Sequence, residues 1–398
     1  IFSNNKNFQD MNDSDIRKCI NGSLDVYGRH KSDLGLYNHF TVKHLFEQIT
    51  VPILVCLGLP GTIFSFIIWT RKQMRYSSSI YLISLAISDS LFIIGHIIWH
   101  LDSTYNIPVI NNRFTCNIFP VFNLLLQYMS PILTLAFTVE RYISICWPFS
   151  KERLCSINRA ITVSAVLFIK SFCIALPMLY FFRFDSTNIN RCLTIYEIYK
   201  SSNPKDESTD WLFIYNIITE SIMFACIPFI ILIINIRVII EMWKIYKSSK
   251  TGIRSSEKSH KGATTVTLLS VSFYLICASL PLTIVHLCGF NLEEGNLCAS
   301  DSEILADAIW RKHFRYVNVQ VFIEFFSLTY YGAKFYIYLG TSEAFRTAFL
   351  QLFVPDNKAF PDSKSSRMDR KVKYDHNCNK CKIIPTENES VNLLSISS

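Results

Sequence analysis

Long apolar stretches, separated by short polar segments, form the main pattern along the chain. A helix needs about 20 apolar residues to cross the roughly 30 Å hydrocarbon core of a bilayer. The stretches of sufficient length are Ile49–Thr70, Ser79–Leu101, Phe114–Val139, Ala160–Phe182, Trp211–Ile236, Ala263–Leu292 and Tyr316–Leu339. Helices are expected, because a spanning segment must satisfy its own backbone hydrogen bonds and the sequence lacks the alternating strands of a barrel. The pattern predicts an all-α membrane protein, a seven-transmembrane helix bundle.

The polar segments between these stretches indicate the orientation. Lysine and arginine gather in 71–75, 151–159 and 244–261, whereas acidic residues gather in 293–307. Basic loops remain on the cytoplasmic side, so we expect the N-terminus outside and the C-terminus inside the plasma membrane. The expected parts are an extracellular segment 1–47, a transmembrane domain 48–353 and a cytoplasmic tail 354–398.

Composition and charge narrow the function classes. The chain is 50% hydrophobic and 18% charged, with a net charge of +8. We attribute this net positive charge to the basic loops that set the membrane orientation. We expect no nucleic-acid partner, since the chain has no soluble basic domain that could bind nucleic acid. The sequence contains no nucleophile–base motif, metal-ligand cluster or glycine-rich phosphate loop. We therefore expect no enzymatic activity, no catalytic residue, no metal and no cofactor, and a lipid bilayer as the surroundings.

Two features of the outer segments suggest covalent modification. Cys116 and Cys192 both fall on the outer side, where an oxidising compartment makes a disulfide plausible. Further cysteines lie outside or nearly so, at Cys19, Cys288 and Cys298, and sequence cannot fix their connectivity. Asn12 and Asn21 each begin a glycosylation triplet in the segment expected outside.

One charge stands inside an apolar stretch. Lys334 lies in the sequence YYGAKFYIYLG, within the last expected helix. A charged side chain at membrane depth is costly and is a functional-site candidate by default. A partner elsewhere in the bundle would lower that cost.

Several motifs occur together at positions that belong to one family. Glu140, Arg141 and Tyr142 end the third stretch, Cys116 precedes Arg141 by 25 residues, and Asp89 lies within the second stretch in LAISD. Proline residues within or near the ends of later stretches complete the set, at Pro177, Pro228 and Pro281. The chain from about residue 48 to 353 resembles a rhodopsin-like (class A) G-protein-coupled receptor. The stretch GLPGTIFSFIIWTRKQMRYSSSIYLISLAISD is similar to invertebrate neuropeptide receptors of the FMRFamide and thyrotropin-releasing-hormone-like type.

The resemblance implies a function and a set of switch residues. A receptor of this kind binds an extracellular peptide and activates a heterotrimeric G protein, with an arrestin as a further partner of the tail. The implied switch residues are Glu140, Arg141, Tyr142 and Tyr338. The segment Ser342–Phe353 resembles the family's eighth helix, a short amphipathic helix on the membrane surface. Lys261 stands where relatives carry an acidic partner for the switch arginine, so we expect Arg141 to be held only by Glu140.

The resemblance also assigns Lys334 to a known motif position. In the family's Asn-Pro-x-x-Tyr motif, Lys334 replaces the Asn and Phe335 the Pro. In the family, the residue at the position of Lys334 faces an Asp at the position of Asp89. These two residues bind a sodium ion together with the residue at the position of Ser130. We expect Lys334 to pair with Asp89 and to replace the sodium ion; the alternative is that Lys334 reaches toward the cytoplasmic headgroups. Opsins carry their retinal lysine ten residues before the motif Tyr, which here is Leu328, so an opsin is not expected.

Family positions also suggest a ligand site. Asn123 stands where amine receptors carry Asp, which argues against a biogenic amine. Glu220 and Glu324 lie in the outer halves of their helices, and the remaining expected lining residues are His286, Trp99, Gln127 and Asn123. Carboxylates and aromatic rings suit a basic peptide, such as one ending in Arg-Phe-amide. The alternative for each carboxylate is a hydrogen bond between helices without ligand contact.

Two other functions remain open at this point. A chemosensory receptor for small molecules would share the same bundle. A transporter would use intramembrane charges as an ion path, although the sequence shows no repeated halves.

Overall fold

A computed structural model provides the structure of the protein. It describes residues 34–74, 76–105, 107, 109–110, 112–147, 151–185, 191–194, 210–249, 256–289 and 306–353. The chain divides into two units, 1–353 and 354–398, and the second lies outside the described residues, as do the glycosylation candidates Asn12 and Asn21 and the cysteines Cys19 and Cys298.

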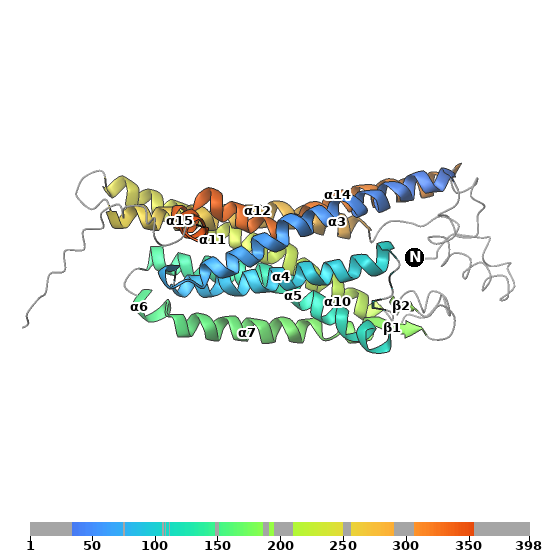
Figure 1. The fold of residues 1–398 in the computed structure, drawn as a ribbon, viewed down its shortest axis with the longest axis horizontal. Coiled ribbons are helices and arrows are strands. Elements are labelled where there is room, and N and C mark those ends of the chain that lie inside the picture. The colour runs from blue at the N-terminus through green and yellow to red at the C-terminus, as the bar shows by residue number, and fades with distance from the viewer. Residues whose placement is uncertain are drawn as a thin grey trace, which may run out of the picture. The chain divides into compact units, whose positions relative to one another are not determined.

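The first unit is a bundle of long helices with one hairpin (Figure 1). Its elements are α3 (Leu34–Trp69), η2 (Lys72–Met74), α4 (Ser77–Tyr105), α5 (Arg113–Cys146), α6 (Lys151–Leu154), α7 (Ile157–Ala175), α8 (Met178–Phe181), β1 (Phe182–Asp185), β2 (Arg191–Thr194), α10 (Asp210–Ser221), η5 (Ile222–Cys226), α11 (Ile227–Ser249), α12 (Ser256–Gly289), α14 (Ala308–Thr341) and α15 (Glu343–Leu350). Helices α6 and α15 lie at one end of the bundle and the hairpin at the other.

Each predicted membrane stretch lies largely within a long helix or a continuous run of helices, and residues 290–292 of the sixth stretch lie outside the described residues. Within the described residues, six helical segments are long and apolar enough to cross a membrane. The seventh, α14, is 34 residues long but carries polar side chains such as Gln320, Glu324 and Lys334 among its apolar ones. The seven-helix bundle is confirmed. Helix α3 begins at Leu34, so the expected outer segment 1–47 ends in a helix.

Polar side chains define where several helices begin. Asn112 Oδ1 accepts hydrogen bonds from the backbone amides of Phe114 and Thr115, at 2.9 and 3.0 Å, at the start of α5. Asp307 does the same for Ile309, at 3.0 Å, at the start of α14. Such caps satisfy amides that have no partner within the helix.

Helices α3 and α14 approach closely because glycines face each other. A Cβ atom added to Gly332 would lie 2.7 Å from the Cα atom of Gly58, and one added to Gly61 would lie 3.0 Å from the Cβ atom of Phe335. Small residues allow such close packing between membrane helices. Neither glycine can gain a side chain unless the two helices move apart.

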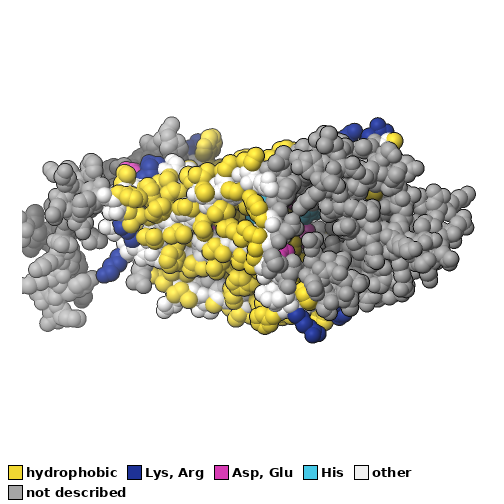
Figure 2. All heavy atoms as spheres, turned by 45° about the vertical axis from the view of Figure 1, so that its right-hand side comes forward, with side chains coloured by type: hydrophobic (Ala, Val, Ile, Leu, Met, Phe, Trp, Pro, Cys, Tyr) yellow, Lys and Arg dark blue, Asp and Glu magenta, His cyan; other side chains and the backbone are white. Residues whose placement is uncertain are grey.

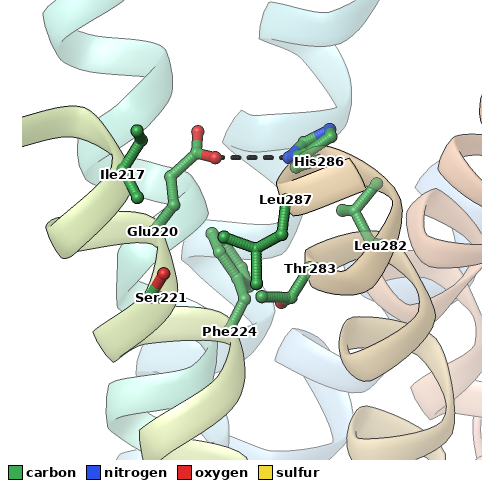
Figure 3. A pocket seen from close by; sticks show the side chains of 8 residues that line it. All are labelled: Ile217, Glu220, Ser221, Phe224, Leu282, Thr283, His286 and Leu287. Atoms are coloured by element: carbon green, nitrogen blue, oxygen red, sulfur yellow. Dashed lines mark hydrogen bonds and ion pairs between the residues drawn. The ribbon is translucent and has the colours of Figure 1, made fainter. Parts of the chain in front are cut away.

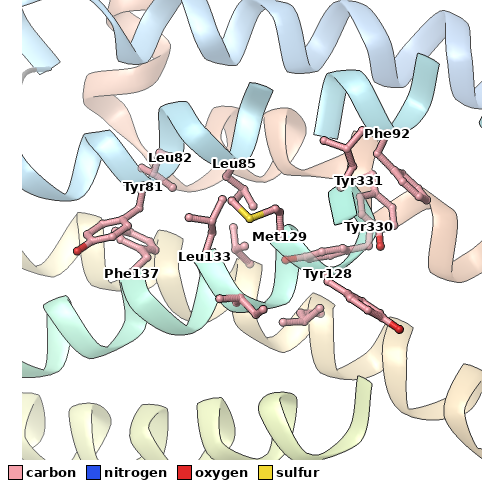
Figure 4. Close-up of a cluster of buried hydrophobic side chains, with 14 of the residues drawn as sticks. Tyr81, Leu82, Leu85, Phe92, Tyr128, Met129, Leu133, Phe137, Tyr330 and Tyr331 are labelled. Carbon is pink, nitrogen blue, oxygen red and sulfur yellow. The ribbon is translucent and has the colours of Figure 1, made fainter. Parts of the chain in front are cut away.

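The interior of the bundle is apolar and aromatic. Side chains of α4, α5 and α14 meet in the cluster of Figure 4, which includes Leu85, Met129, Leu133, Tyr330 and Tyr331. On the outside, hydrophobic side chains form a broad area with lysine and arginine beyond it (Figure 2). A helix that is apolar on both its inner and outer faces is typical of a membrane span.

Helix α10 continues into α11 through a π-helical turn, η5 (Ile222–Cys226). Pro228 follows directly, at the second residue of α11. A proline in a helix removes one backbone donor and clashes with the carbonyl group one turn earlier, and a π-turn accommodates both effects. The extra residue in this turn rotates the side chains of α10, which include Glu220, relative to those of α11.

The hairpin is attached to the bundle by a disulfide bond. Strands β1 and β2 are antiparallel, with Phe184 opposite Cys192. Cys192 is bonded to Cys116 at the start of α5. The predicted disulfide is therefore present, and it holds the hairpin at the end of the bundle where α5 begins.

Candidate functional site

The centre of the bundle contains a buried ion pair. Lys334 Nζ on α14 lies 2.7 Å from Asp89 Oδ2 on α4. The same ammonium donates to Ser130 Oγ on α5 at 2.7 Å, and this hydroxyl donates to Asp89 Oδ1 at 3.0 Å. The exposed fractions of the two charged side chains are 3% and 1%. We call these three residues the polar centre; it links α4, α5 and α14.

An aromatic side chain completes the surroundings of the ammonium. Lys334 Nζ lies 3.8 Å from the ring centroid of Tyr330, within the range of a cation–π interaction. The Tyr330 hydroxyl is hydrogen-bonded to Thr134 Oγ1 at 2.9 Å. The lysine therefore has a carboxylate, a hydroxyl and an aromatic face as partners at full burial. It does not extend toward the headgroups, so the alternative position for this side chain is wrong.

Nearer the other end, two carboxylates meet one histidine. His286 Nδ1 on α12 lies 3.2 Å from Glu220 Oε2 on α10, and its Nε2 lies 3.7 Å from Glu324 Oε1 on α14. Gln320 donates to the same Glu324 oxygen at 2.6 Å. We call Glu220, His286 and Glu324 the acidic cluster. It bridges three helices that are far apart in the sequence.

A small pocket opens beside this cluster. Figure 3 shows Glu220 and His286 facing each other across it, joined by their hydrogen bond, with Phe224, Thr283 and Leu287 below. The side chains of Glu220 and His286 are only partly buried, with exposed fractions of 25% and 32%. Water or a ligand group can therefore reach the carboxylates.

The other expected lining residues have separate surroundings. Trp99 stacks with Phe119 at 6.4 Å and meets Phe182 of the hairpin edge-on at 6.2 Å. Asn123 lies against Gly95 of α4, since a Cβ atom there would be 2.8 Å from Asn123 Oδ1. Gln127 is half-buried on α5.

The switch residues at the opposite end of α5 contact α4. Arg141 donates to Ser78 Oγ at 2.5 Å, and Ser77 donates to Glu140 Oε1 at 2.8 Å. The expectation that Arg141 is held only by Glu140 is therefore wrong, because the first turn of α4 supplies a hydroxyl. Tyr142, next in the chain, is half-buried.

Tyr338 belongs to an aromatic group that holds α15. Phe345 on α15 is fully buried, with ring centroids 5.3 Å from Trp69 and 5.4 Å from Tyr338. Phe335, in the place of the motif's proline, packs against Phe345 at 5.9 Å. A helix is thus present at Glu343–Leu350, shorter than the expected Ser342–Phe353. Its position on a membrane surface stays a prediction.

Three contacts were missed by sequence reasoning. Gln320 lies four residues before Glu324, a spacing that places two side chains on one helix face, and this signal was available. The cation–π partner Tyr330 also precedes Lys334 by four residues. Ser78 carried no such signal, because its contact with Arg141 joins two helices.

The fold and the buried polar residues define a multi-pass membrane bundle of the receptor type. The profile of the 7 transmembrane receptor (rhodopsin family) matches residues 62–313, more than half of the chain. The chain belongs to this family, whose members are receptors and not enzymes.

The sequence identity to individual members of the family is low. The chain is 28% identical to the thyrotropin-releasing hormone receptor of Gallus gallus over 167 residues, which cover 42% of each protein. It is 25% identical to the FMRFamide receptor of Drosophila melanogaster over 372 residues, 83% of this chain and 60% of that receptor. It is 30% identical to the pyrokinin-1 receptor of Drosophila melanogaster over 137 residues, 32% of this chain and 30% of that receptor. The matches thus span less than two thirds of each of these three relatives.

Proposed function

We propose that the protein is a plasma-membrane receptor, N-terminus outside, that binds an extracellular peptide with a basic side chain and activates a heterotrimeric G protein. The observation that carries this proposal is the acidic cluster. Two carboxylates from different helices share one histidine in a partly open position. The names of the three relatives reported above, receptors for thyrotropin-releasing hormone, FMRFamide and pyrokinin, support the same class of ligand.

The electrostatics of the cluster favour a cationic ligand group. Even a protonated His286 leaves one carboxylate charge of Glu220 and Glu324 uncompensated within the cluster. A guanidinium group can form two parallel hydrogen bonds with a carboxylate. An arginine side chain of a peptide, as in an Arg-Phe-amide end, would fit this requirement, and Trp99 offers an aromatic face at the same end of the bundle.

Neutralising one carboxylate is expected to weaken binding in a charge-specific way. In Glu220→Gln or Glu324→Gln, the affinity for a basic peptide should fall about tenfold to a hundredfold, because hydrogen bonds to charged groups contribute about 1.5–3 kcal/mol. A neutral analogue with citrulline in place of arginine should lose much less. Radioligand competition with the two peptides on each variant measures the difference.

The matched control is Glu241→Gln on the same run of helices. Glu241 pairs with the exposed Lys244 far from the cluster, and its loss should leave both affinities unchanged. Equal losses for the basic and the neutral peptide would contradict the charge argument.

The proposed G-protein surface at the other end consists of Arg141, α15 and the expected third loop Tyr246–Lys261. An arrestin is a further partner of the tail. Lys261 takes the place of the acidic residue that would hold Arg141 in related receptors. In the part of the chain that the structure describes, Arg141 contacts the neutral Ser78 hydroxyl and the Phe137 ring. We expect basal signalling above that of a mock-transfected control, measured by calcium and cyclic-nucleotide assays without ligand. Ligand-free signalling no greater than the control would contradict this expectation.

The ligand itself is to be found by screening. A neuropeptide library with the same two readouts tests the proposal directly. Activation by small volatile or odorant molecules and by no peptide would favour the chemosensory alternative. The transporter alternative is set aside by membership of a receptor family.

A further inference from the structure

Helix α7 carries a lysine in the middle of its membrane span. The span runs from Ile157 to Phe181, so Lys170 follows its first residue by 13 positions and precedes its last residue by 11. At 1.5 Å per residue, these separations correspond to about 20 and about 17 Å along the helix. The hydrocarbon core of a bilayer is about 30 Å thick. Lys170 therefore lies close to the mid-plane of the membrane.

The side chain of Lys170 points away from the bundle. Helix α7 packs against α4 and α5, and its buried residues, among them Ser164, Ser171 and Ala175, lie on one side of the helix. Lys170 is exposed, and the neighbouring Ile169 is 60% exposed. A smaller share of this span is buried than of the other five candidate spans, and α7 forms one edge of the bundle (Figure 1). In a bilayer, this face of α7 contacts lipid.

The described part of the chain contains no partner for this ammonium group. Lys170 takes part in no hydrogen bond or ion pair with the residues that the structure describes. The other intramembrane lysine, Lys334, has a carboxylate oxygen at 2.7 Å. Charged side chains at membrane depth almost always face the interior of a bundle or a water-filled cavity, where they are paired. Lys170 faces the hydrocarbon instead, so its partner has to come from outside the bundle.

Lipid headgroups are too far away to supply that partner. A lysine side chain can bend along its helix toward the interface. Its length is about 6 Å, whereas the edge of the hydrocarbon core lies about 15 Å from the mid-plane. The phosphates of phospholipids and the carboxylates of fatty acids remain at that edge. A carboxylate at the depth of Lys170 therefore requires a second transmembrane helix.

A second copy of this chain does not supply such a carboxylate from the residues that the structure describes. The intramembrane carboxylates Asp89, Glu220 and Glu324 belong to the polar centre or to the acidic cluster inside the bundle. Most homodimers are two-fold symmetric, and a symmetric contact through this face would place two Lys170 ammonium groups opposite each other. The occupant of this face is therefore a different protein.

We propose that the outward face of α7 around Lys170 binds a transmembrane helix of a second membrane protein, one that carries an aspartate or glutamate near its centre. The carboxylate pairs with the Lys170 ammonium in hydrocarbon, where each charge alone is costly. Val166 and Cys173 are exposed within about one turn of Lys170 on the same face and provide the packing surface. Apolar contact does not distinguish a helix from lipid, so the ion pair determines which helix binds.

The test uses the full chain in phosphatidylcholine vesicles and a synthetic polyleucine transmembrane peptide with one central aspartate. Energy transfer between a fluorophore on the protein and one on the peptide measures association as the peptide is titrated. The aspartate peptide should bind about fivefold to thirtyfold more tightly than the same peptide with leucine at the centre, the size of one polar contact between membrane helices. Lys170→Met should remove this difference, and Lys170→Arg should keep it.

Two controls separate a specific contact from general attraction between charges. Lys244→Met removes an exposed lysine on α11 and should leave the binding of the aspartate peptide unchanged. A peptide with a cysteine four residues from the aspartate reports where the peptide lies. Mild oxidation should join it to Cys173, and not to Cys56 or Cys226, which are exposed free cysteines on α3 and η5.

Three results would overturn the proposal. The first is equal binding of the aspartate and leucine peptides to the wild-type protein. The second is equal crosslinking of the cysteine peptide to Cys173, Cys56 and Cys226. The third is association of the protein with itself, without peptide, that Lys170→Met abolishes, because the occupant of this face would then be a second copy of the chain.

Discussion

Lys334→Met is expected to destabilise the bundle by about 3–5 kcal/mol, because it leaves the Asp89 carboxylate buried without its counter-ion. Asp89 would keep the hydrogen bond from Ser130, but one hydroxyl cannot compensate a full charge at 1% exposure. The measurement is the midpoint of thermal unfolding of the purified protein in nanodiscs, followed by tryptophan fluorescence.

Two further variants distinguish the effect of breaking the ion pair from the effect of removing a lysine side chain. Asp89→Asn combined with Lys334→Met removes both charges, and it should recover most of the stability lost in the single variant. Lys170→Met removes a lysine that is exposed on α7 and should have little effect. A double variant as unstable as Lys334→Met alone would show that the lysine acts through its packing and not through its charge.

Lys334→Asn is expected to make agonist binding sensitive to sodium. In the wild-type protein, the Lys334 ammonium occupies the space between Asp89 and Ser130, so a sodium ion would have to displace a covalently attached cation. The shorter Asn side chain leaves that space free beside a carboxylate and a hydroxyl, which are suitable ligands for a hard cation. If sodium binds only the state that the agonist disfavours, agonist affinity falls by about tenfold at ten times the sodium dissociation constant.

The experiment is agonist binding across a sodium series at fixed ionic strength, with N-methylglucamine as the replacing cation. The wild-type affinity should stay constant across the series. Asp89→Asn combined with Lys334→Asn is the control, since without the carboxylate the sodium effect should disappear. Strong sodium inhibition of the wild-type protein would contradict the idea that the lysine replaces the ion.

A buried pair of this kind also explains why a costly charge can be retained in α14. An ion pair in a low-dielectric interior need not add net stability, because the cost of removing both ions from water is large. It does favour one arrangement of α4, α5 and α14 over those in which the charges are apart. A receptor works by shifting the equilibrium between such arrangements. In this protein, the covalently attached Lys334 ammonium contributes to that equilibrium in place of a bound ion.

The sequence predicted the helices well because the bilayer sets a simple requirement. A segment that crosses hydrocarbon must be apolar over its whole length, and this is visible residue by residue. Helix ends were less accurate. Helix α3 begins at Leu34 and α12 at Ser256, well before the apolar stretches Ile49–Thr70 and Ala263–Leu292, because a helix can continue beyond the membrane with polar residues.

By itself, the sequence determined the number of long helices and the identity of the charged residues within them. The tertiary structure decided which of these residues meet. Asp89 and Lys334 are 245 positions apart, and Glu220 and His286 are 66 apart. Such contacts depend on the rotation and depth of each helix, which are set by packing features such as the facing glycines Gly58 and Gly332. A rotation of about 100° separates consecutive residues of a helix, so an apolar pattern that is nearly uniform around each helix cannot specify which side chain faces a partner.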